Sequence, residues 1–427
     1  MKKINSMRHV IPALALGSTL LLGGCGVLED ILTVEAPSQV VATDMAEPAA
    51  ASLLVASVAN EFRCALTHYN IASALTGMEF DDAAANSVLE IWDTRNHDTS
   101  GYGAQYASAN CGSGNPALYL PLSQTRWLAD DVLTKLAEWD AADVPDKSRF
   151  QAETALWAGY SYLLLGESMC QVVFDGGPAQ AVDAAFALAV ARFDVTIQQG
   201  SSDHQNVARV GKARALKNMG DLSAASTAAA SVPSGFSFTL GYSNAESVTR
   251  NKAWETNIRD ADVTVGTVYR DRSFGGVLDG RTTTVDTGLT GRSGAEVWEM
   301  TKYPDASTPI ELGGWEEAQL IVAEYAVSQG RLDDAVAIID VLHTNAGLPL
   351  YSAVVPGATA TQVQDQIVWE RGAEMFLEGH HLWDIREYSL PLEPPVGATS
   401  NSGAFYSDEL CFQIPAREFQ NNDNVTG

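Results

Sequence analysis

Few residues in this chain of 427 have the types and spacing that metal binding or catalysis requires. Glu378 and His381 form a Glu-x-x-His step, the ligand pattern of di-metal helix bundles. Such a bundle needs a second step and further glutamates, whereas the chain has only seven histidines and no second Glu-x-x-His. Cys64 and His68 stand four apart and could share a helical face, but one such pair is at most half a zinc site. We therefore predict neither a metal nor another cofactor.

The common catalytic motifs are also absent from the sequence. It contains no Gly-x-Ser-x-Gly elbow, no His-Glu-x-x-His, no P-loop and no Gly-x-Gly-x-x-Gly after a strand. A carboxylate pair for glycoside hydrolysis requires a separation of roughly 5 to 10 Å, which only the folded chain sets. With 53 acidic residues the sequence does not single out such a pair. We predict a protein that is not an enzyme, with an exported glycoside hydrolase as an alternative.

The chain is strongly acidic. It has 53 Asp plus Glu against 26 Lys plus Arg, which gives a formal net charge of −27. Such a surface repels phosphate backbones and anionic lipid headgroups, which argues against binding of nucleic acid and against peripheral membrane binding. The composition is otherwise that of a globular protein, with 46% hydrophobic residues. Solubility in a salty or extracellular medium explains the charge.

The first 25 residues predict export and a lipid anchor. A positively charged head precedes an apolar run over 10–24, which is too short to span a membrane and suits a signal-peptide core. The run ends in Leu-Gly-Gly-Cys at 22–25, which resembles a bacterial lipobox. The resemblance implies removal of residues 1–24 and a diacylglyceryl group on Cys25. No second apolar run approaches spanning length, so lipid would be the only membrane attachment. The alternative is an ordinary secretory signal with an incidental cysteine.

Four cysteines remain after Cys25, an even number that suits two disulfides in an oxidising compartment. Three connectivities are possible. Closeness in sequence favours pairing Cys64 with Cys111, which leaves Cys170 with Cys411.

After residue 45 the spacing of apolar residues is mainly that of helices. Helices are therefore expected to form the scaffold that positions any functional residue. Apolar residues recur at i, i+3 and i+4 over 48–66, 119–139 and 148–166. A short internal repeat, Gly-Asp-Leu at 220–222 and Gly-Arg-Leu at 330–332, places a turn glycine between two helical stretches. This pattern is typical of tetratricopeptide hairpins, and a looser copy runs through the chain near Gly166. Unrelated helical hairpins are the alternative.

Two segments rich in loop-forming residues interrupt the helices. Residues 232–313 combine Gly, Ser, Thr, Asp and Arg with strand-like runs at 236–240, 263–269 and 282–285. Residues 93–115 are broken by repeated glycines. Loops mounted on a rigid scaffold are where binding residues commonly lie.

The C-terminal third carries the most specific motifs. Residues 369–374 read Trp-Glu-Arg-Gly-Ala-Glu, residues 378–386 read Glu-Gly-His-His-Leu-Trp-Asp-Ile-Arg, and residues 411–418 read Cys-Phe-Gln-Ile-Pro-Ala-Arg-Glu. In this order they resemble the C-terminal end of the SusD/RagB family of nutrient-binding outer-membrane lipoproteins. His381 and Glu387 stand where that family commonly has basic residues, which puts local ion pairing in doubt but not the fold.

We interpret the charged residues of these motifs as structural. Glu370, Glu374 and Glu378 fall at i, i+4 and i+8 on one helical face. Such carboxylates can pin a turn against a helix through charge-assisted hydrogen bonds with arginines. The predicted structural set, including the ending that the family shares, is Glu370, Arg371, Glu374, Glu378, Asp384, Arg386, Pro415 and Glu418.

The resemblance spans almost the whole chain after Cys25 and implies its fold. We expect a mainly α structure in which tetratricopeptide-like hairpins form a right-handed superhelical scaffold, decorated with irregular loops and a few short strands. After a tether over 25–45, one SusD-like domain would cover 46–427. Its parts are the helical scaffold at about 119–231 and 314–346, the loop-rich insertion at about 232–313, and the family-motif region at about 361–427.

The resemblance also implies a function. A lipoprotein of this family would capture oligosaccharide or peptide at the cell surface and act as the lid of a SusC-like TonB-dependent outer-membrane transporter. A tetratricopeptide-type scaffold protein of the envelope, without a nutrient ligand, is the alternative from another class.

Sugars present flat C–H faces that stack on aromatic rings, and hydroxyls that bind polar side chains. Tyr102 and Tyr106, flanked by glycine and polar residues, are the preferred candidates for such contacts, with packing as the alternative role for each ring. The full set of predicted ligand-binding residues is Trp92, Arg95, Asn96, Tyr102, Tyr106, Trp298, Tyr303 and Asp305.

Overall fold

The computed structural model describes residues 44–97 and 100–425. The chain divides into residues 1–45 and one compact unit, Ala46–Gly427. The predicted signal peptide, Cys25 and nearly all of the predicted tether lie outside the described residues.

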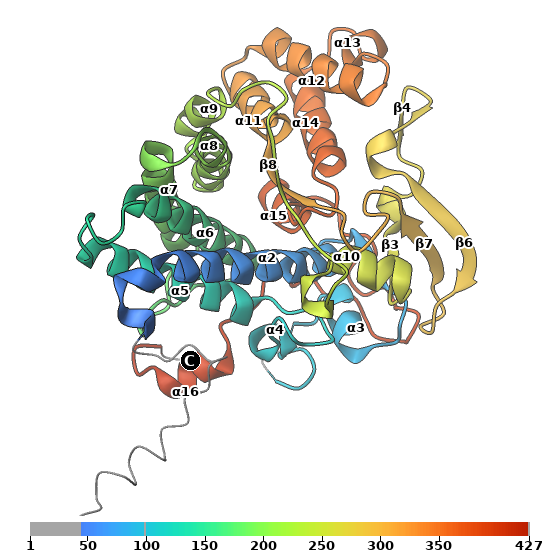
Figure 1. The fold of residues 1–427 in the computed structure, drawn as a ribbon. Coiled ribbons are helices and arrows are strands. Elements are labelled where there is room, and N and C mark those ends of the chain that lie inside the picture. The colour runs from blue at the N-terminus through green and yellow to red at the C-terminus, as the bar shows by residue number, and fades with distance from the viewer. Residues whose placement is uncertain (1–43, 98–99, 426–427) are drawn as a thin grey trace, which may run out of the picture. The chain divides into compact units, whose positions relative to one another are not determined.

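Helical hairpins form one side of the compact unit (Figure 1). Neighbouring helices along the chain pack against one another, and α9 also packs against α11, so the array continues across the segment that separates them. The predicted mainly α fold with few short strands is confirmed. The helices of the array are α5 (Tyr119–Glu138), α6 (Lys147–Ser168), α7 (Asp183–Gln199), α8 (Ser202–Asn218), α9 (Leu222–Ala229), α11 (Trp315–Ser328) and α12 (Leu332–Ala346).

The two copies of the internal repeat, at 220–222 and 330–332, adopt the same turn. Gly220 and Gly330 have φ angles of +81° and +71°, a left-handed conformation that glycine adopts without the steric cost of a Cβ. In each copy the next helix begins two residues after the glycine. Ala225 and Ala335, at matching positions of these second helices, are fully buried. Their small side chains let the paired helices approach closely.

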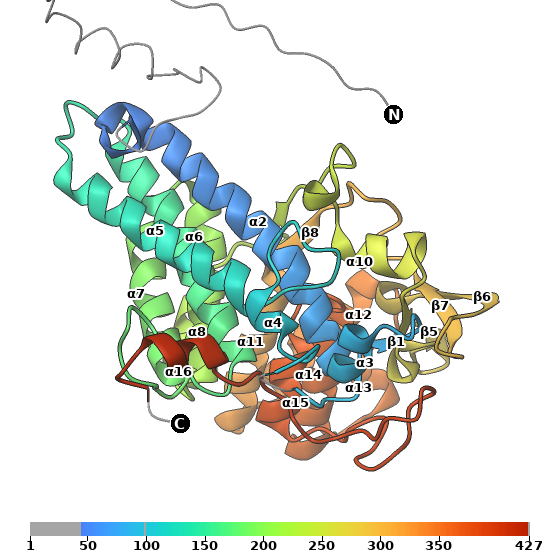
Figure 2. The ribbon, with the colours of Figure 1, turned by 90° about the horizontal axis from the view of Figure 1, so that it is seen from below.

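Helix α2 (Ala51–Thr76) runs through the core beside α5 and also packs against α6 (Figure 2). Every residue from 64 to 76 is buried, the polar His68 and Asn70 included. By length and composition, Pro48–Thr76 is the one helix of the described chain that could cross a membrane. The expectation that no second run approaches spanning length is therefore wrong, although burial in the core accounts for this run.

Four antiparallel pairs of short strands lie mainly on the other side of the unit, on the right in Figure 1. The predicted strand-like runs correspond to β2, β3 and β6, although residues 267–269 form a 3-10 turn. The pairs are β1 (Phe80–Asp82) with β3 (Val263–Val265), β2 (Ser237–Leu240) with β8 (Ile310–Gly314), β4 (Ser273–Phe274) with β5 (Val277–Leu278), and β6 (Thr284–Thr290) with β7 (Glu296–Met300).

Short helices and two disulfides complete the unit. The Cys64–Cys111 disulfide joins α2 to the loop before α5, and Cys170–Cys411 joins the residues after α6 to the C-terminal segment. These are the two pairs that closeness in sequence favours. The remaining helices are α3 (Ser87–Asp93), α4 (Gln105–Ser108), α10 (Lys252–Trp254), α13 (Tyr351–Val354), α14 (Ala360–Glu374), α15 (His381–Tyr388) and α16 (Ala416–Asn421).

Four of the predicted structural residues of α14 and α15 form ion pairs. Arg371 and Asp384 form a forked contact, with Arg371 Nη2 2.8 Å from Asp384 Oδ1, and both side chains are at most 3% exposed. Glu370 and Glu374 both bind Nη1 of Arg281, each at 2.7 Å. Arg281 lies in the predicted insertion, so sequence spacing could not pair it with α14.

The other predicted structural residues also have defined contacts. Glu378 Oε1 lies 2.6 Å from Lys302 Nζ rather than beside His381 in a metal-ligand pair. Among the described residues no group of three or more His, Cys, Asp or Glu could hold a metal ion. Arg386 donates to the Glu167 carbonyl, Pro415 is the N-cap of α16, and Glu418 accepts a hydrogen bond from Tyr119.

Candidate functional site

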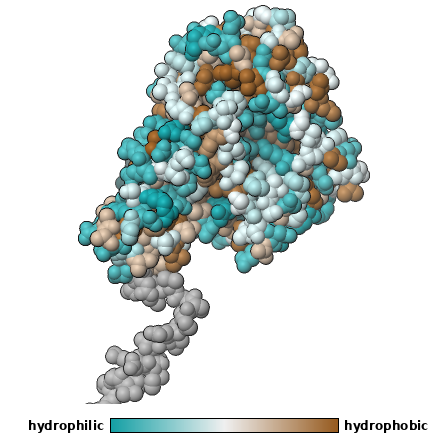
Figure 3. Space-filling model, turned by 45° about the horizontal axis from the view of Figure 1, so that its top comes forward, coloured by the Kyte–Doolittle hydropathy of each residue, from teal (hydrophilic) through white to brown (hydrophobic). Residues whose placement is uncertain are grey.

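Two neighbouring cavities share Arg270 in their walls. One is a polar pocket of about 230 Å³ between the β1–β3 pair, α3 and the segment 394–406. The other is a groove of about 620 Å³ that contains Trp369, called here the Trp369 groove. In the space-filling view, hydrophilic residues cover much of one face of the unit and apolar residues gather in small patches (Figure 3).

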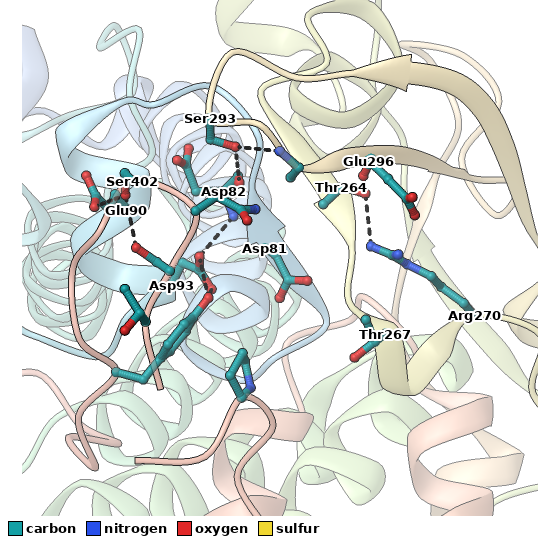
Figure 4. A pocket seen from close by; sticks show the side chains of 16 residues that line it. Asp81, Asp82, Glu90, Asp93, Thr264, Thr267, Arg270, Ser293, Glu296 and Ser402 are labelled. Atoms are coloured by element: carbon teal, nitrogen blue, oxygen red, sulfur yellow. Dashed lines mark hydrogen bonds between the residues drawn. The ribbon is translucent and has the colours of Figure 1, made fainter. Parts of the chain in front are cut away.

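Carboxylates dominate the polar pocket (Figure 4). Asp81 and Asp82 come from β1, where pairing with β3 sets Asp81 opposite Thr264. The wall also offers eight groups that can exchange hydrogen bonds with sugar hydroxyls: Thr264, Thr267, Ser293, Thr399, Ser400, Asn401, Ser402 and Tyr406. The complete set of lining carboxylates is Asp81, Asp82, Glu90, Asp93 and Glu296.

Hydrogen bonds fix the geometry of the polar pocket. Asp93 Oδ2 accepts from the Asp82 amide and from the Tyr406 hydroxyl, both at 3.2 Å. Ser402 donates to Glu90 and so holds the segment 394–406 against α3. The Asp81 carboxylate, by contrast, accepts no hydrogen bond from the described residues and points into the pocket. It is therefore free to accept one from a ligand.

Burial and charge raise the pKa of the three aspartates of this pocket, Asp81, Asp82 and Asp93. Burial raises the pKa of Asp81 and of Asp82 to about 6, and the charge of Arg270 opposes this rise at Asp81. Burial and the nearby charge of Asp81 raise the pKa of Asp93. A carboxyl group that is partly protonated near pH 6 can donate as well as accept a hydrogen bond. The pocket is thus suited to an uncharged ligand rich in hydroxyls.

The Trp369 groove supplies aromatic and apolar surface on the other side of Arg270. Arg272 lies over the Trp369 ring at 4.7 Å and over the Tyr269 ring at 5.2 Å, and it donates to the Trp369 carbonyl at 2.9 Å. These contacts hold the Trp369 side chain in place while leaving it half-buried. Apolar side chains complete the wall, namely Met78, Val268, Val368, Leu390 and Pro391.

Comparison with known proteins points to one family. A sequence model of the SusD family matches residues 317–423, which contain the motifs at 369–386 and 411–418. A SusD superfamily protein from Bacteroides vulgatus superposes with a TM-score of 0.64 at 13% identity, covering 89% of this chain and 98% of that one. Residues 317–423 match the SusD family, and the fold of the chain is SusD-like.

Other solved structures share the fold of this SusD/RagB-like chain. A SusD-like carbohydrate binding protein from Bacteroides vulgatus has a TM-score of 0.65 at 14% identity, covering 89% of this chain and 97% of its own. A SusD superfamily protein from Parabacteroides distasonis has a TM-score of 0.63 at 13% identity, with coverages of 91% and 99%. No protein with a curated description matches the sequence.

Four of the predicted ligand-binding residues are buried and line neither cavity, so they take the packing role that was the alternative for them. Trp92 and Tyr106 pack against Phe412, with ring centroids 5.7 and 5.1 Å away. They face the core because the disulfide-linked C-terminal segment, which carries Phe412, packs against both rings. The four residues, each at most 2% exposed, are Trp92, Arg95, Tyr106 and Tyr303.

Arg95 has a positioning role instead. Its guanidinium donates to the carbonyls of Ser407 at 2.8 Å and Pro394 at 2.6 Å. It also lies 5.0 Å from the centre of the Tyr406 ring. Arg95 therefore fixes the segment 394–406, which forms one wall of the polar pocket.

The remaining predicted residues lie outside the two cavities. Trp298 comes nearest, because Arg270 lies over its ring at 5.2 Å. Asn96 is exposed and donates to the Phe405 carbonyl, and Asp305 is exposed and caps its own turn. Tyr102 is 62% exposed but lines neither cavity.

The residues that do line the cavities were not predicted as ligand-binding. Trp369 was noted only as part of a family motif. The paired aspartates of β1 and Arg270 carry no motif, since their meeting depends on the β1–β3 pairing. One signal was available, because the segment 391–404 is rich in Pro, Gly and Ser and is therefore a loop of the kind that carries binding residues.

The two tyrosines that were the preferred candidates should behave differently. Tyr106→Phe should lower the free energy of unfolding by roughly 0.5 to 1.5 kcal/mol, because the buried Tyr106 side chain no longer donates its hydrogen bond of 2.8 Å to the Gln413 carbonyl. Tyr102→Phe, at an exposed ring, should change it by less than about 0.5 kcal/mol. Urea denaturation measures the free energy of unfolding of both variants. Equal changes would contradict the finding that Tyr106 is buried and Tyr102 is exposed.

Proposed function

We propose that this SusD/RagB-like protein captures oligosaccharide and binds it across the polar pocket and the Trp369 groove. The observation that carries the proposal is that the two cavities meet at Arg270. One side offers partners for hydroxyl groups and the other offers apolar surface for C–H faces, which is the pair of contacts that a sugar needs. A structural neighbour described as a SusD-like carbohydrate binding protein supports the same ligand class.

The charges of the site favour neutral or cationic glycans over polyanions. Five carboxylates line the polar pocket, whereas Arg270 is its one cationic lining residue. The chain as a whole has a net charge of −27, which adds a long-range repulsion of anions.

The proposal extends to cell location and assembly. The lipobox-like end of the apolar run supports a lipid on Cys25, and the family resemblance supports residence on the outer-membrane surface. There the protein would act as the lid of a SusC-like TonB-dependent transporter and deliver the captured glycan to it. Peptide is the second ligand class that the resemblance allows.

A binding assay tests the proposed site directly. A glycan array followed by calorimetry should identify an oligosaccharide for the wild type, and Asp81→Asn should weaken its binding about tenfold, because a pocket-facing acceptor is lost. Asp140→Asn removes the same charge from an exposed position outside both cavities and should bind normally.

Two outcomes would contradict the proposed site. Equal binding by Asp81→Asn and wild type would place the ligand elsewhere. Breakdown of the bound glycan by the purified wild type, lost in Asp81→Asn, would favour the exported hydrolase, because Asp81 and Asp93 would then be its acidic pair.

The lipid anchor has its own test. Cys25→Ala should move the protein from the membrane fraction to the soluble fraction, because one lipidated residue carries the whole anchor. Cys111→Ser, which leaves Cys25 in place, serves as the control for general effects of losing a cysteine. Unchanged fractionation of Cys25→Ala would overturn the anchor.

A further inference from the structure

The Trp369 groove contains two arginines, Arg270 and Arg272, and neither forms an ion pair with a carboxylate of the described chain. Unpaired arginines stand out in a chain whose acidic residues outnumber the basic ones by 53 to 26. The two acids that line the groove, Asp365 and Glu393, are exposed and lie beyond ion-pair distance of either arginine. The positive charge of the groove wall is therefore not compensated by direct contacts.

Each of these arginines is held by contacts that leave a terminal nitrogen free. Arg270 donates from Nε to the Val265 carbonyl at 2.8 Å and from Nη2 to the Thr264 hydroxyl at 3.4 Å (Figure 4). Arg272 donates from Nη2 to the Trp369 carbonyl at 2.9 Å. In both side chains Nη1 has no acceptor among the described residues, and neither Nη1 is cut off from solvent. These nitrogens can donate hydrogen bonds to a ligand in the groove.

The groove also fixes the orientation of Arg272. The rings of Trp369 and Tyr269 lie beside its guanidinium, at 4.7 and 5.2 Å. Gly372, on α14, leaves the space that the free nitrogen occupies, because a Cβ there would lie 3.0 Å from Arg272 Nη1. An arginine that is already held in place loses less conformational entropy on binding than a mobile surface arginine does.

We propose that the Trp369 groove binds a single carboxylate group of the captured glycan through Arg270 and Arg272. The ligand is then an oligosaccharide that contains one uronic acid residue among neutral sugars. A guanidinium donates charge-assisted hydrogen bonds to a carboxylate, and these are roughly twice as strong as hydrogen bonds between neutral groups. The proposal rests on the proposed glycan site and specifies the ligand of that site.

The electrostatics of the two cavities agree with one carboxylate but not with many. Burial lowers the pKa of both arginines, so a bound carboxylate would offset the cost of burying their charge. His381, which also lines the groove, stays neutral because burial lowers its pKa to about 4. The polar pocket, with five lining carboxylates, repels further anionic groups. A glycan suits both cavities when its carboxylate lies in the groove and its neutral residues lie in the polar pocket.

Paired oligosaccharides test the proposal. A glycan array presents oligosaccharides with one glucuronic or galacturonic acid residue, each beside the analogue in which the carboxyl group is reduced to a primary alcohol. We expect the wild type to bind the acid at least about fivefold more tightly than its reduced analogue, and calorimetry on the best pair measures this preference. A tetramer of galacturonic acid should bind more weakly than the singly charged glycan, because the polar pocket repels its other carboxylates.

Variants of the groove locate the preference. Arg272→Gln should bring the affinities for the acid and the reduced analogue to within about twofold of each other. Its affinity for the reduced analogue should stay near that of the wild type, which also shows that the variant is folded. Gly372→Ala keeps every charge but places a Cβ against Arg272 Nη1, so it should also lower the preference. Arg331→Gln, at a side chain that is 51% exposed and outside both cavities, is the control and should keep the full preference.

Several results would overturn the proposal. Equal affinity of the wild type for the acid and its reduced analogue would do so, as would a preference that survives both Arg272→Gln and Gly372→Ala, or tighter binding of the galacturonic acid tetramer. Binding of tetraalanine with a free carboxyl terminus, but of no acidic glycan, would assign the groove to peptide instead. The proposed glycan site is judged separately by the effect of Asp81→Asn on the reduced analogue, and absence of binding to every glycan would overturn both proposals.

Discussion

Replacing both Cys170 and Cys411 by serine should destabilise the compact unit by about 4 to 5 kcal/mol. The disulfide links residues 241 apart in sequence, so its loss frees a long loop in the unfolded chain. Cys64→Ser with Cys111→Ser opens a loop of only 47 residues and should cost about 1.5 kcal/mol less. Urea denaturation of the two double variants measures both values. A larger loss for the shorter loop would contradict this account.

The same variant should also affect ligand capture. The Cys170 amide donates to the Phe412 carbonyl and the Phe412 amide donates to the Ser168 carbonyl, so the disulfide reinforces a backbone contact between α6 and the C-terminal segment. Ser407 and Pro394, which Arg95 binds, lie just before that contact. Loosening it should weaken glycan binding at the polar pocket. Normal glycan affinity in the Cys170→Ser, Cys411→Ser variant would show that Arg95 holds the wall alone.

The scaffold was predictable because its determinants are local. The turn at Gly220 and Gly330 needs a left-handed residue, and the buried alanines after it need small side chains, so the pattern can be read from the sequence. One ion pair of the C-terminal motifs has a similarly local basis, because Arg371 and Asp384 lie on neighbouring helices. The partners of the three motif glutamates lie instead in the loop-rich insertion, which sequence spacing does not indicate.

The ligand-binding residues were less predictable because exposure depends on distant parts of the chain. Tyr106 stands among glycines and polar residues, which is typical of an exposed loop, yet Phe412 covers it from more than three hundred residues away. The polar pocket likewise joins β1, β3, α3 and the segment 394–406. The spacing of residues along the sequence does not indicate that these four segments lie together.

Breaking the forked ion pair between Arg371 and Asp384 should also lower the stability of the unit strongly. Arg371→Met should destabilise the unit by about 3 to 5 kcal/mol, because Asp384 would remain buried and charged without its partner. Arg149→Met is the matched control, since Arg149 pairs with Asp146 and Glu153 at the surface and is 54% exposed. Its loss should change stability by less than about 1 kcal/mol.

A second substitution separates two contributions to the free energy of unfolding: the penalty for leaving Asp384 unpaired, and the net stabilisation by the ion pair. Adding Asp384→Leu to Arg371→Met should restore most of the lost stability, because no buried charge is then left unpaired. Denaturation of both single variants and the double variant completes the cycle. A double variant as unstable as the sum of the two single variants would show that the arginine stabilises the turn by packing. In that case Arg371 and Asp384 would stabilise the turn through the packing of their side chains rather than through their opposite charges.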